Sequence, residues 1–188
     1  CAAFAICGGC SLQHLVPEQQ ILAKQQTLLD NLQRIGKVQP ERVLDPLTGP
    51  VWGYRNKARL GVKYVRKKGR VLVGFREKRS PYLADIARCE VLHAAVGPRL
   101  GELAELIQGM AARERIAQIE VAVGDASAVL VFRNLDPLSD GDTQKLVDYA
   151  QQTGLHIPDQ FNAACWPAGN NVNLVSQIGQ HIGSSSCS

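Results

Sequence analysis

The sequence lacks several features that would assign it to whole classes of protein. It has no run of about 18 apolar residues, so we expect no membrane-spanning helix. It opens on Cys1 without the basic and apolar segments of a signal peptide, which makes the reducing cytoplasm the expected compartment. It has no internal repeat and no glycine-rich nucleotide-binding loop after a predicted strand. What remains is a cytoplasmic globular protein whose cysteines favour metal binding over disulfides.

Charge is distributed unevenly along the 188 residues, which carry a net charge of +4. Between Tyr54 and Arg79 there are eleven Lys or Arg residues and one acid, Glu77. The rest of the chain has ten basic and sixteen acidic residues. Such a concentrated basic segment usually binds a polyanion, and a solvated basic face is the alternative.

The first third of the chain predicts a loop, a helix and an irregular connection. Residues 1–14 are rich in glycine and cysteine without a helical period, which predicts a loop wrapped around a ligand. Apolar residues then recur at helical spacing from Pro17 until Gly36. Three prolines and two glycines predict an irregular connection over 38–53.

Residues 56–77 predict a β-hairpin, because apolar and basic side chains alternate on both sides of a turn from Arg66 to Gly69. A short third strand is expected at 82–86. The apolar face is expected to comprise Ala58, Leu60, Val62, Tyr64, Val71, Val73 and Phe75.

The second half of the chain mixes helices and strands. We expect a helix over 92–110, interrupted at Pro98, and two strands over 119–123 and 126–132 that are joined by the turn Gly124–Asp125. A capped helix should follow over 139–153, and a last strand over 155–157. This order predicts an α+β fold, an antiparallel β-sheet with flanking helices and an N-terminal cysteine-rich loop. We expect one domain over 1–157 and a poorly defined tail over 158–188.

Three thiols, those of Cys1, Cys7 and Cys10, lie within ten residues, and Cys89 is the natural fourth ligand. Four thiolates are the usual complement for zinc or for an iron–sulfur cluster. Zinc sites usually contain two Cys-x2-Cys pairs, and only one is present. The spacing therefore favours an iron–sulfur cluster and leaves zinc open. The two remaining cysteines, expected to be free thiols, are Cys165 and Cys187.

The basic face of the predicted hairpin can neutralise phosphates, which gives affinity without sequence readout. Trp52 and Tyr54 lie beside it and could stack on unpaired bases, with core packing as the alternative. The candidate RNA contacts are Trp52, Tyr54, Arg55, Lys57, Arg59, Lys63, Arg70 and Arg76.

Four motifs occur in an order that closely resembles the bacterial RNA 5-methyluridine methyltransferases, and most closely the branch acting on 23S ribosomal RNA. The run from Cys1 to His14 resembles the iron–sulfur signature of that family. The run from Trp52 to Leu60 looks like its second signature. The last two motifs are Gly74-Phe75-Arg76 and Ala87-Arg88-Cys89-Glu90.

The resemblance implies a parent enzyme with an N-terminal TRAM domain, a central domain carrying a 4Fe–4S cluster, and a C-terminal domain that binds S-adenosylmethionine. This chain is expected to be the central part alone. It would bind ribosomal RNA as a monomer without catalysing methyl transfer. Cys165 does not sit in the family's catalytic motif. Two other readings stay open: a stand-alone RNA-binding module with a structural metal, and a redox iron–sulfur protein.

Overall fold

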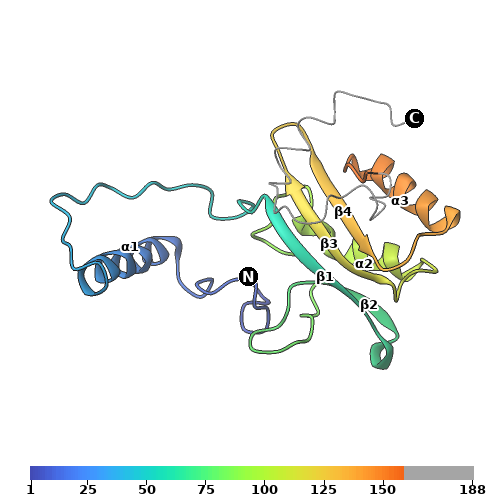
Figure 1. The fold of residues 1–188 in the computed structure, drawn as a ribbon, viewed down its shortest axis with the longest axis horizontal. Helices are drawn as coiled ribbons and strands as arrows, with labels where there is room; N and C mark the ends of the chain where they lie inside the picture. The colour runs from blue at the N-terminus through green and yellow to red at the C-terminus, as the bar shows by residue number, and fades with distance from the viewer. Residues whose placement is uncertain (159–188) are drawn as a thin grey trace.

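The computed structural model describes residues 1–158, which form an α+β fold built on one four-stranded antiparallel sheet (Figure 1). The strand order is β2-β1-β3-β4. The α+β class and the antiparallel sheet predicted from the sequence are confirmed. The expectations for Cys165, Cys187 and the rest of the tail lie outside the described residues. The strands are β1 (Lys57–Val65), β2 (Arg70–Gly74), β3 (Ile116–Val123) and β4 (Ala128–Asn134).

Three α-helices accompany the sheet in the described part of the chain: α1 (Pro17–Arg34), α2 (Leu100–Gln108) and α3 (Asp140–Thr153). Helices α2 and α3 lie on the same face of the sheet, whereas α1 stands apart from it (Figure 1). Short 3-10 turns occur at η1 (Arg66–Lys68) and η2 (Gly97–Arg99). Within this part of the chain, no helix combines the length and apolar character needed to cross a membrane.

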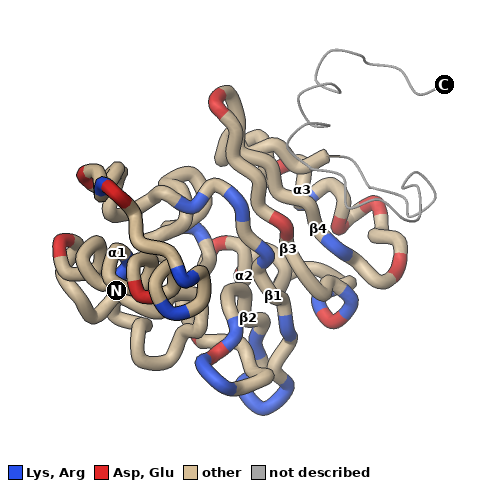
Figure 2. Tube along the Cα trace, turned by 60° about the vertical axis from the view of Figure 1, so that its left-hand side comes forward, with Lys and Arg blue, Asp and Glu red and all other residues tan. Residues whose placement is uncertain are grey.

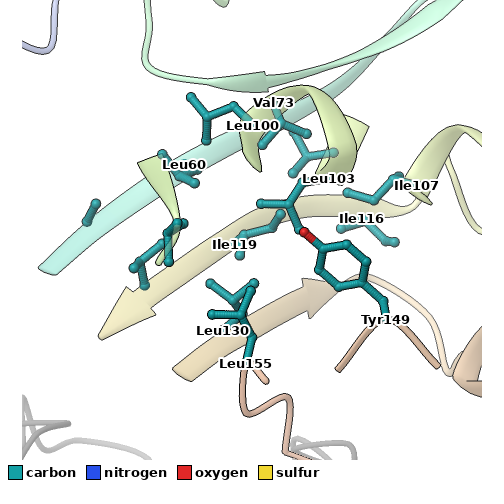
Figure 3. Close-up of a cluster of buried hydrophobic side chains, with 14 of the residues drawn as sticks. Leu60, Val73, Leu100, Leu103, Ile107, Ile116, Ile119, Leu130, Tyr149 and Leu155 are labelled. Atoms are coloured by element: carbon teal, nitrogen blue, oxygen red, sulfur yellow. The ribbon is translucent and has the colours of Figure 1, made fainter. Parts of the chain in front are cut away.

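The core fills the space between the sheet and helices α2 and α3 (Figure 3). Leu100, Leu103 and Ile107 of α2 are fully buried, as the helical period predicted. They meet Leu60 and Ile119, which are also fully buried, on the facing side of β1 and β3. The strict alternation in β1 therefore has its expected cause, because every second side chain enters this core.

The β1–β2 hairpin forms as predicted, with Gly69 closing the turn. Its φ of 66° lies in the left-handed region, which glycine enters without a steric penalty. One expectation for β2 was wrong: Leu72, assigned to the basic face, is buried. The predicted third strand at 82–86 is only a single bridge between Leu83 and Arg76.

Three other expectations need correction. The helix predicted over 92–110 begins only at Leu100, because Pro98 belongs to the preceding 3-10 turn. The β3–β4 turn lies one residue later than predicted, since the Gly124 N–H donates to the Ser127 carbonyl oxygen at 2.9 Å. The expected strand at 155–157 is one parallel bridge between His156 and Val129.

Residues 17–51 lie between the N-terminal segment, residues 1–16, and the sheet, and we call this excursion the arm. Helix α1 runs outward and an extended segment, residues 35–51, runs back (Figure 1). None of the α1 residues is buried, and residues 35–51 are exposed throughout. The arm therefore differs from α2 and α3, because it contributes no buried residue to the core.

Candidate metal centre and nucleic-acid interface

All four predicted cysteine ligands line one small cleft, although Cys89 is 79 positions from Cys10 in the sequence. Cys7 is buried, Cys10 and Cys89 are half-buried, and Cys1 is exposed. Apolar side chains close the same cleft, notably Phe75. The fold therefore brings together the set that the sequence singled out. His14, a weaker candidate, is not among the residues that line the cleft and packs its ring against Phe4.

Backbone pairing holds the cysteine loop, residues 1–16, beside the end of β2. The Gly8 N–H donates to the Arg76 carbonyl oxygen at 2.8 Å, and the Lys78 N–H donates to the Ile6 carbonyl oxygen at 2.8 Å. The Lys78 ammonium also lies 3.5 Å from the centre of the Phe4 ring. The loop is thus attached along its length to the segment that follows the basic hairpin.

Two adjacent glycines allow this close approach. A Cβ on Gly8 would lie 2.9 Å from the Arg76 carbonyl oxygen, closer than real Cβ contacts occur. A Cβ on Gly9 would lie 3.1 Å from the Phe75 ring. The Gly9 N–H donates to the Cys7 sulfur at 3.4 Å. Such N–H···S bonds stabilise a thiolate that binds a metal.

Arg55 links the cysteine loop to the sheet. Its guanidinium donates to the Gly9 carbonyl oxygen at 3.1 Å and lies 5.5 Å from the centre of the Phe75 ring. The side chain is half-buried, unlike its basic neighbours on β1. Sequence reasoning counted Arg55 among the RNA contacts and missed this internal role, because nothing local in the sequence signals a bond to residue 9.

The electrostatics around Cys89 fit a cation site. Burial raises the pKa of the Cys89 thiol, while backbone hydrogen bonds at Leu92 and Val91 act in the opposite direction. Negative charge on Cys10 and Cys7 raises this pKa further, so the three sulfurs lie within electrostatic reach of one another. Several thiolates placed so closely need a positive partner to remain ionised.

The side chains do not converge on one point. In residues 1–158, no group of three or more His, Cys, Asp or Glu residues is arranged to hold a single metal ion. The cysteines instead stand around a cleft that is open to solvent at Cys1.

A basic surface runs along β1 and the hairpin turn, beside the cysteine loop (Figure 2). Lys57, Arg59 and Lys63 are exposed on β1, and Arg76 is exposed just beyond β2. The alternation of the strand puts the three β1 cations on the side of the sheet away from α2. This part of the predicted RNA face is therefore accessible as expected.

Acidic side chains neutralise other members of the basic segment. Asp85 accepts hydrogen bonds from Lys68 at 2.7 Å and from Arg70 at 2.5 Å. The Lys68 hydrogen bond, with the charge of Arg70, holds the pKa of Asp85 below its usual range. Arg66 pairs with Glu114 at 2.9 Å. Sequence reasoning missed Asp85 because it lies outside the basic run.

The cations that form no ion pair with another described residue are better placed to meet a phosphate. Within residues 1–158, the members of the predicted basic face without such an ion pair include Lys57, Lys63, Lys67 and Arg76. Arg59, in contrast, lies 4.0 Å from Glu120.

The aromatic rings beside the basic surface are accessible. Trp52 and Tyr54 expose 46% and 47% of their surfaces, so both rings are open to a stacking partner. Tyr64 is half-buried beneath Arg113, which lies 5.1 Å from its ring centre.

Comparison with known proteins finds relatives of this chain among the RNA 5-methyluridine methyltransferases. No protein-family model matches the chain. The relatives are nonetheless close, and the resemblance read from the four motifs is confirmed. The chain spans only about 36–41% of the length of the first three curated relatives it matches.

These relatives are named 23S rRNA (uracil(1939)-C(5))-methyltransferase RlmD. The protein from Alkalilimnicola ehrlichii is 55% identical over 85% of this chain and 36% of its own length. That from Alcanivorax borkumensis is 52% identical over 95% of this chain and 38% of its own length. That from Nitrosococcus oceani is 50% identical over 96% of this chain and 41% of its own length.

A solved structure shares the fold. It is the Pyrococcus abyssi tRNA (uracil-54, C5)-methyltransferase in complex with S-adenosyl-L-homocysteine, with a TM-score of 0.52 and 23% identity. The match covers 74% of this chain and 34% of that chain. At this identity, the likeness supports the fold alone.

Proposed function

We propose that this chain is the iron–sulfur, RNA-binding part of a cytoplasmic, S-adenosylmethionine-dependent enzyme that forms 5-methyluridine in 23S ribosomal RNA. Residues 1–157 are its central domain. The single observation that carries this proposal is the convergence of Cys1, Cys7, Cys10 and Cys89 on one cleft beside an exposed basic hairpin. The close relatives supply the reaction class, because they are named as 23S rRNA uracil-C5 methyltransferases.

The four cysteines would hold a 4Fe–4S cluster. They line one cleft, and four cysteine thiolates are the usual ligand set of such a cluster. The Gly9 N–H, the pairing of residues 6–8 with 76–78 and the Arg55 bond to Gly9 would orient the thiolates. We assign the cluster a structural role, that of fixing the cysteine loop against the hairpin.

The basic surface would bind the RNA backbone. Lys57, Lys63 and Arg76 would neutralise phosphates, while Trp52 and Tyr54 would stack on bases exposed in a single-stranded loop. These contacts would hold the target uridine at a fixed place. Its C5 atom would then face the methyl donor, S-adenosylmethionine, which supplies the methyl group when bound elsewhere in the longer enzyme. The chain itself, a monomer, would carry no catalytic thiol.

The cluster is tested by purifying the chain without oxygen and measuring iron, sulfide and visible absorbance. We expect four irons and four sulfides per chain, as a 4Fe–4S centre requires. Cys89→Ser should remove most of the iron, while Cys165→Ser should leave it unchanged. Bound zinc, or no metal in anaerobic protein, would refute the cluster. A reversible redox couple without RNA affinity would favour an electron-transfer protein instead.

The RNA surface is tested by measuring the affinity for a 23S ribosomal RNA hairpin across a range of salt concentrations. Replacing Lys57 and Lys63 with Gln should lower the slope of log K against log salt by about one for each lost phosphate contact. The matched control replaces Lys24 and Lys37, which are exposed on the arm, with Gln. Equal slopes for the two double variants would contradict the assignment of the surface.

A further inference from the structure

A short segment, residues 82–86, crosses the outer face of the β1–β2 hairpin, on the side of the sheet away from α2, and we call it the strap. Backbone pairing attaches it to the end of β2. The Ala84 N–H donates to the Phe75 carbonyl oxygen at 2.9 Å. The Tyr82 carbonyl oxygen accepts from the Glu77 N–H, also at 2.9 Å. Since Ala84 has no exposed surface, the strap is a packed part of the hairpin.

Two glycines of the hairpin make room for the strap. Gly61 and Gly74 stand opposite each other on β1 and β2. A Cβ on Gly61 would lie 2.6 Å from the Leu83 Cδ2 atom, closer than real Cβ contacts occur. A Cβ on Gly74 would lie 3.1 Å from the Ile86 side chain. These contacts fix the strap on both sides of Asp85, so its carboxylate has a defined place on the outer face.

Asp85 brings a negative charge into the predicted RNA face. One of its carboxylate oxygens, Oδ2, accepts from Lys68 at 2.7 Å and from Arg70 at 2.5 Å. The hydrogen bond from Lys68 holds the pKa of Asp85 below its ordinary value, so the carboxylate stays ionised at neutral pH. In Figure 2, acidic positions lie among the cations around β2. Three charged side chains here therefore leave a net charge of only one.

The cations of β1 are arranged differently. Lys57 and Lys63 are exposed on the same outer face and form no ion pair with another described residue. The basic surface is thus divided. Its β1 side offers free cations, whereas Lys68 and Arg70 point at an acid that the strap holds in place.

This division affects which RNA the surface binds. Phosphate contacts add affinity for any RNA and read no sequence. Every further free cation would therefore strengthen binding to unrelated RNA, and a fixed carboxylate beside the RNA repels its phosphates. Discrimination between partners commonly includes such a repulsive element.

From this arrangement we propose that Asp85 is a specificity-determining residue, which keeps Lys68 and Arg70 away from the RNA backbone. Phosphates are then confined to the described cations without an acidic partner, such as Lys57 and Lys63. RNA whose shape fits these positions binds, and RNA that needs the cations beside the strap is disfavoured. This inference rests on the proposed function, because it takes RNA as the ligand of the basic surface.

The test uses the chain purified without oxygen and measures its affinity for a 23S ribosomal RNA hairpin and for an unrelated RNA of equal length, over a range of salt concentrations. Asp85→Asn should steepen the slope of log K against log salt for the unrelated RNA by about one to two, one for each released cation. At fixed salt, the affinity for that RNA should rise about three- to tenfold. The 23S hairpin should gain less, so the ratio of the two affinities falls.

The matched control is Asp148→Asn, which makes the same charge change at an exposed position of α3, on the other side of the sheet. It should leave both the slope and the ratio unchanged. An unchanged ratio in Asp85→Asn would overturn the proposal. Weaker RNA binding in Asp85→Asn would overturn it too, because Asp85 would then orient its two cations towards phosphate.

A second pair of variants leaves the strap intact. Lys68→Gln with Arg70→Gln should keep the salt slope of the parent chain, because these cations do not contact phosphate there. The same two changes in the Asp85→Asn chain should lower the slope by about two. Equal losses in both backgrounds would show that Lys68 and Arg70 contact RNA despite Asp85, and would overturn the proposal.

The parent chain reports the proposed function separately. If it binds neither RNA, the proposed function fails and the role of Asp85 fails with it. If it prefers the 23S hairpin and Asp85→Asn keeps that preference, the role of Asp85 fails alone.

Discussion

The sheet with α2 and α3 (residues 53–158, the body) and the arm (residues 17–51) are both rich in leucine, yet they use it in opposite ways. In the body, Leu60, Leu100 and Leu103 have no exposed surface. In the arm, Leu44 is mostly exposed and Leu47 is fully exposed. Burial of apolar surface is the main source of folding free energy, so the body can fold by its own contacts and the arm cannot.

The difference shows which part of the chain buries its own apolar side chains and which part does not. The body satisfies its polar groups as well as its apolar ones, because no buried side-chain nitrogen or oxygen in the described residues lacks a hydrogen bond. The arm forms helix α1 but leaves apolar side chains such as Leu28 and Leu47 exposed to water. A self-sufficient unit thus carries an element that gains its stability from contact with something else.

The largest expected effect contrasts one leucine from each region. Leu103→Ala in the body should lower the free energy of unfolding by about 2–5 kcal/mol, because it leaves a cavity in a packed core. Leu47→Ala in the arm should change it by less than about 0.5 kcal/mol, since the side chain is already in water. Urea unfolding of both variants of this chain measures the contrast. Similar losses would mean that the arm is packed in solution.

A buried carboxylate gives the second prediction. Asp142, 2% exposed, accepts hydrogen bonds from the Ala111 and Ala112 N–H groups at 3.0 and 2.9 Å. Asp142→Ala should therefore lower the free energy of unfolding by about 1–3 kcal/mol, because two backbone N–H groups lose the buried carboxylate that accepts from them. The matched control is Asp148→Ala, an exposed position on the same helix α3.

The pH dependence follows from the same site. Burial by itself raises the pKa of Asp142, but the hydrogen bonds from Ala112, Ala111 and Lys145 outweigh it and hold the pKa below its ordinary value. Asp142 then contributes stability above the unfolded-state pKa, and this contribution is lost as the pH falls through the folded-state pKa. Unfolding of the parent chain and of Asp142→Ala should become more alike towards low pH. A constant gap would contradict the role of the charge.

Local patterns predicted most of the body. Alternation identified β1 and β2, and the helical period identified the buried stripe of α2, because burial on one face imposes these periods directly. Asp142 shows what a local sequence pattern does not predict. The Ser139 side chain accepts from the Asp142 N–H at the start of α3, as expected of a capped helix, but the Asp142 carboxylate accepts from the Ala112 N–H, 30 residues away. Such long-range partners leave no trace in a local pattern.

In the candidate site, too, some features were predictable from the sequence and others were not. The thiols were found from their spacing and the family motifs, and the structure brings all four to one cleft. The pairing of charges was not predictable, because Asp85 reaches Lys68 and Arg70 only through the fold. The helix of the arm was predicted correctly as a helix, and its isolation was not. An apolar stripe indicates that a face will be covered, without saying by which part of the protein.

The smallest expected effect lies at the base of the arm, where Arg55 joins the body to the cysteine loop that precedes the arm. Its bond to the Gly9 carbonyl oxygen spans 46 positions and closes the chain before and after the arm. Arg55→Gln should lower the free energy of unfolding by about 0.5–1.5 kcal/mol and speed amide exchange at residues 8–10. Arg76→Gln, at an exposed neighbouring cation, is the control and should change the unfolding free energy by less than about 0.5 kcal/mol while weakening RNA binding. If Arg55→Gln instead weakens RNA binding as much as Arg76→Gln and leaves exchange unchanged, Arg55 contacts phosphate and does not hold the loop.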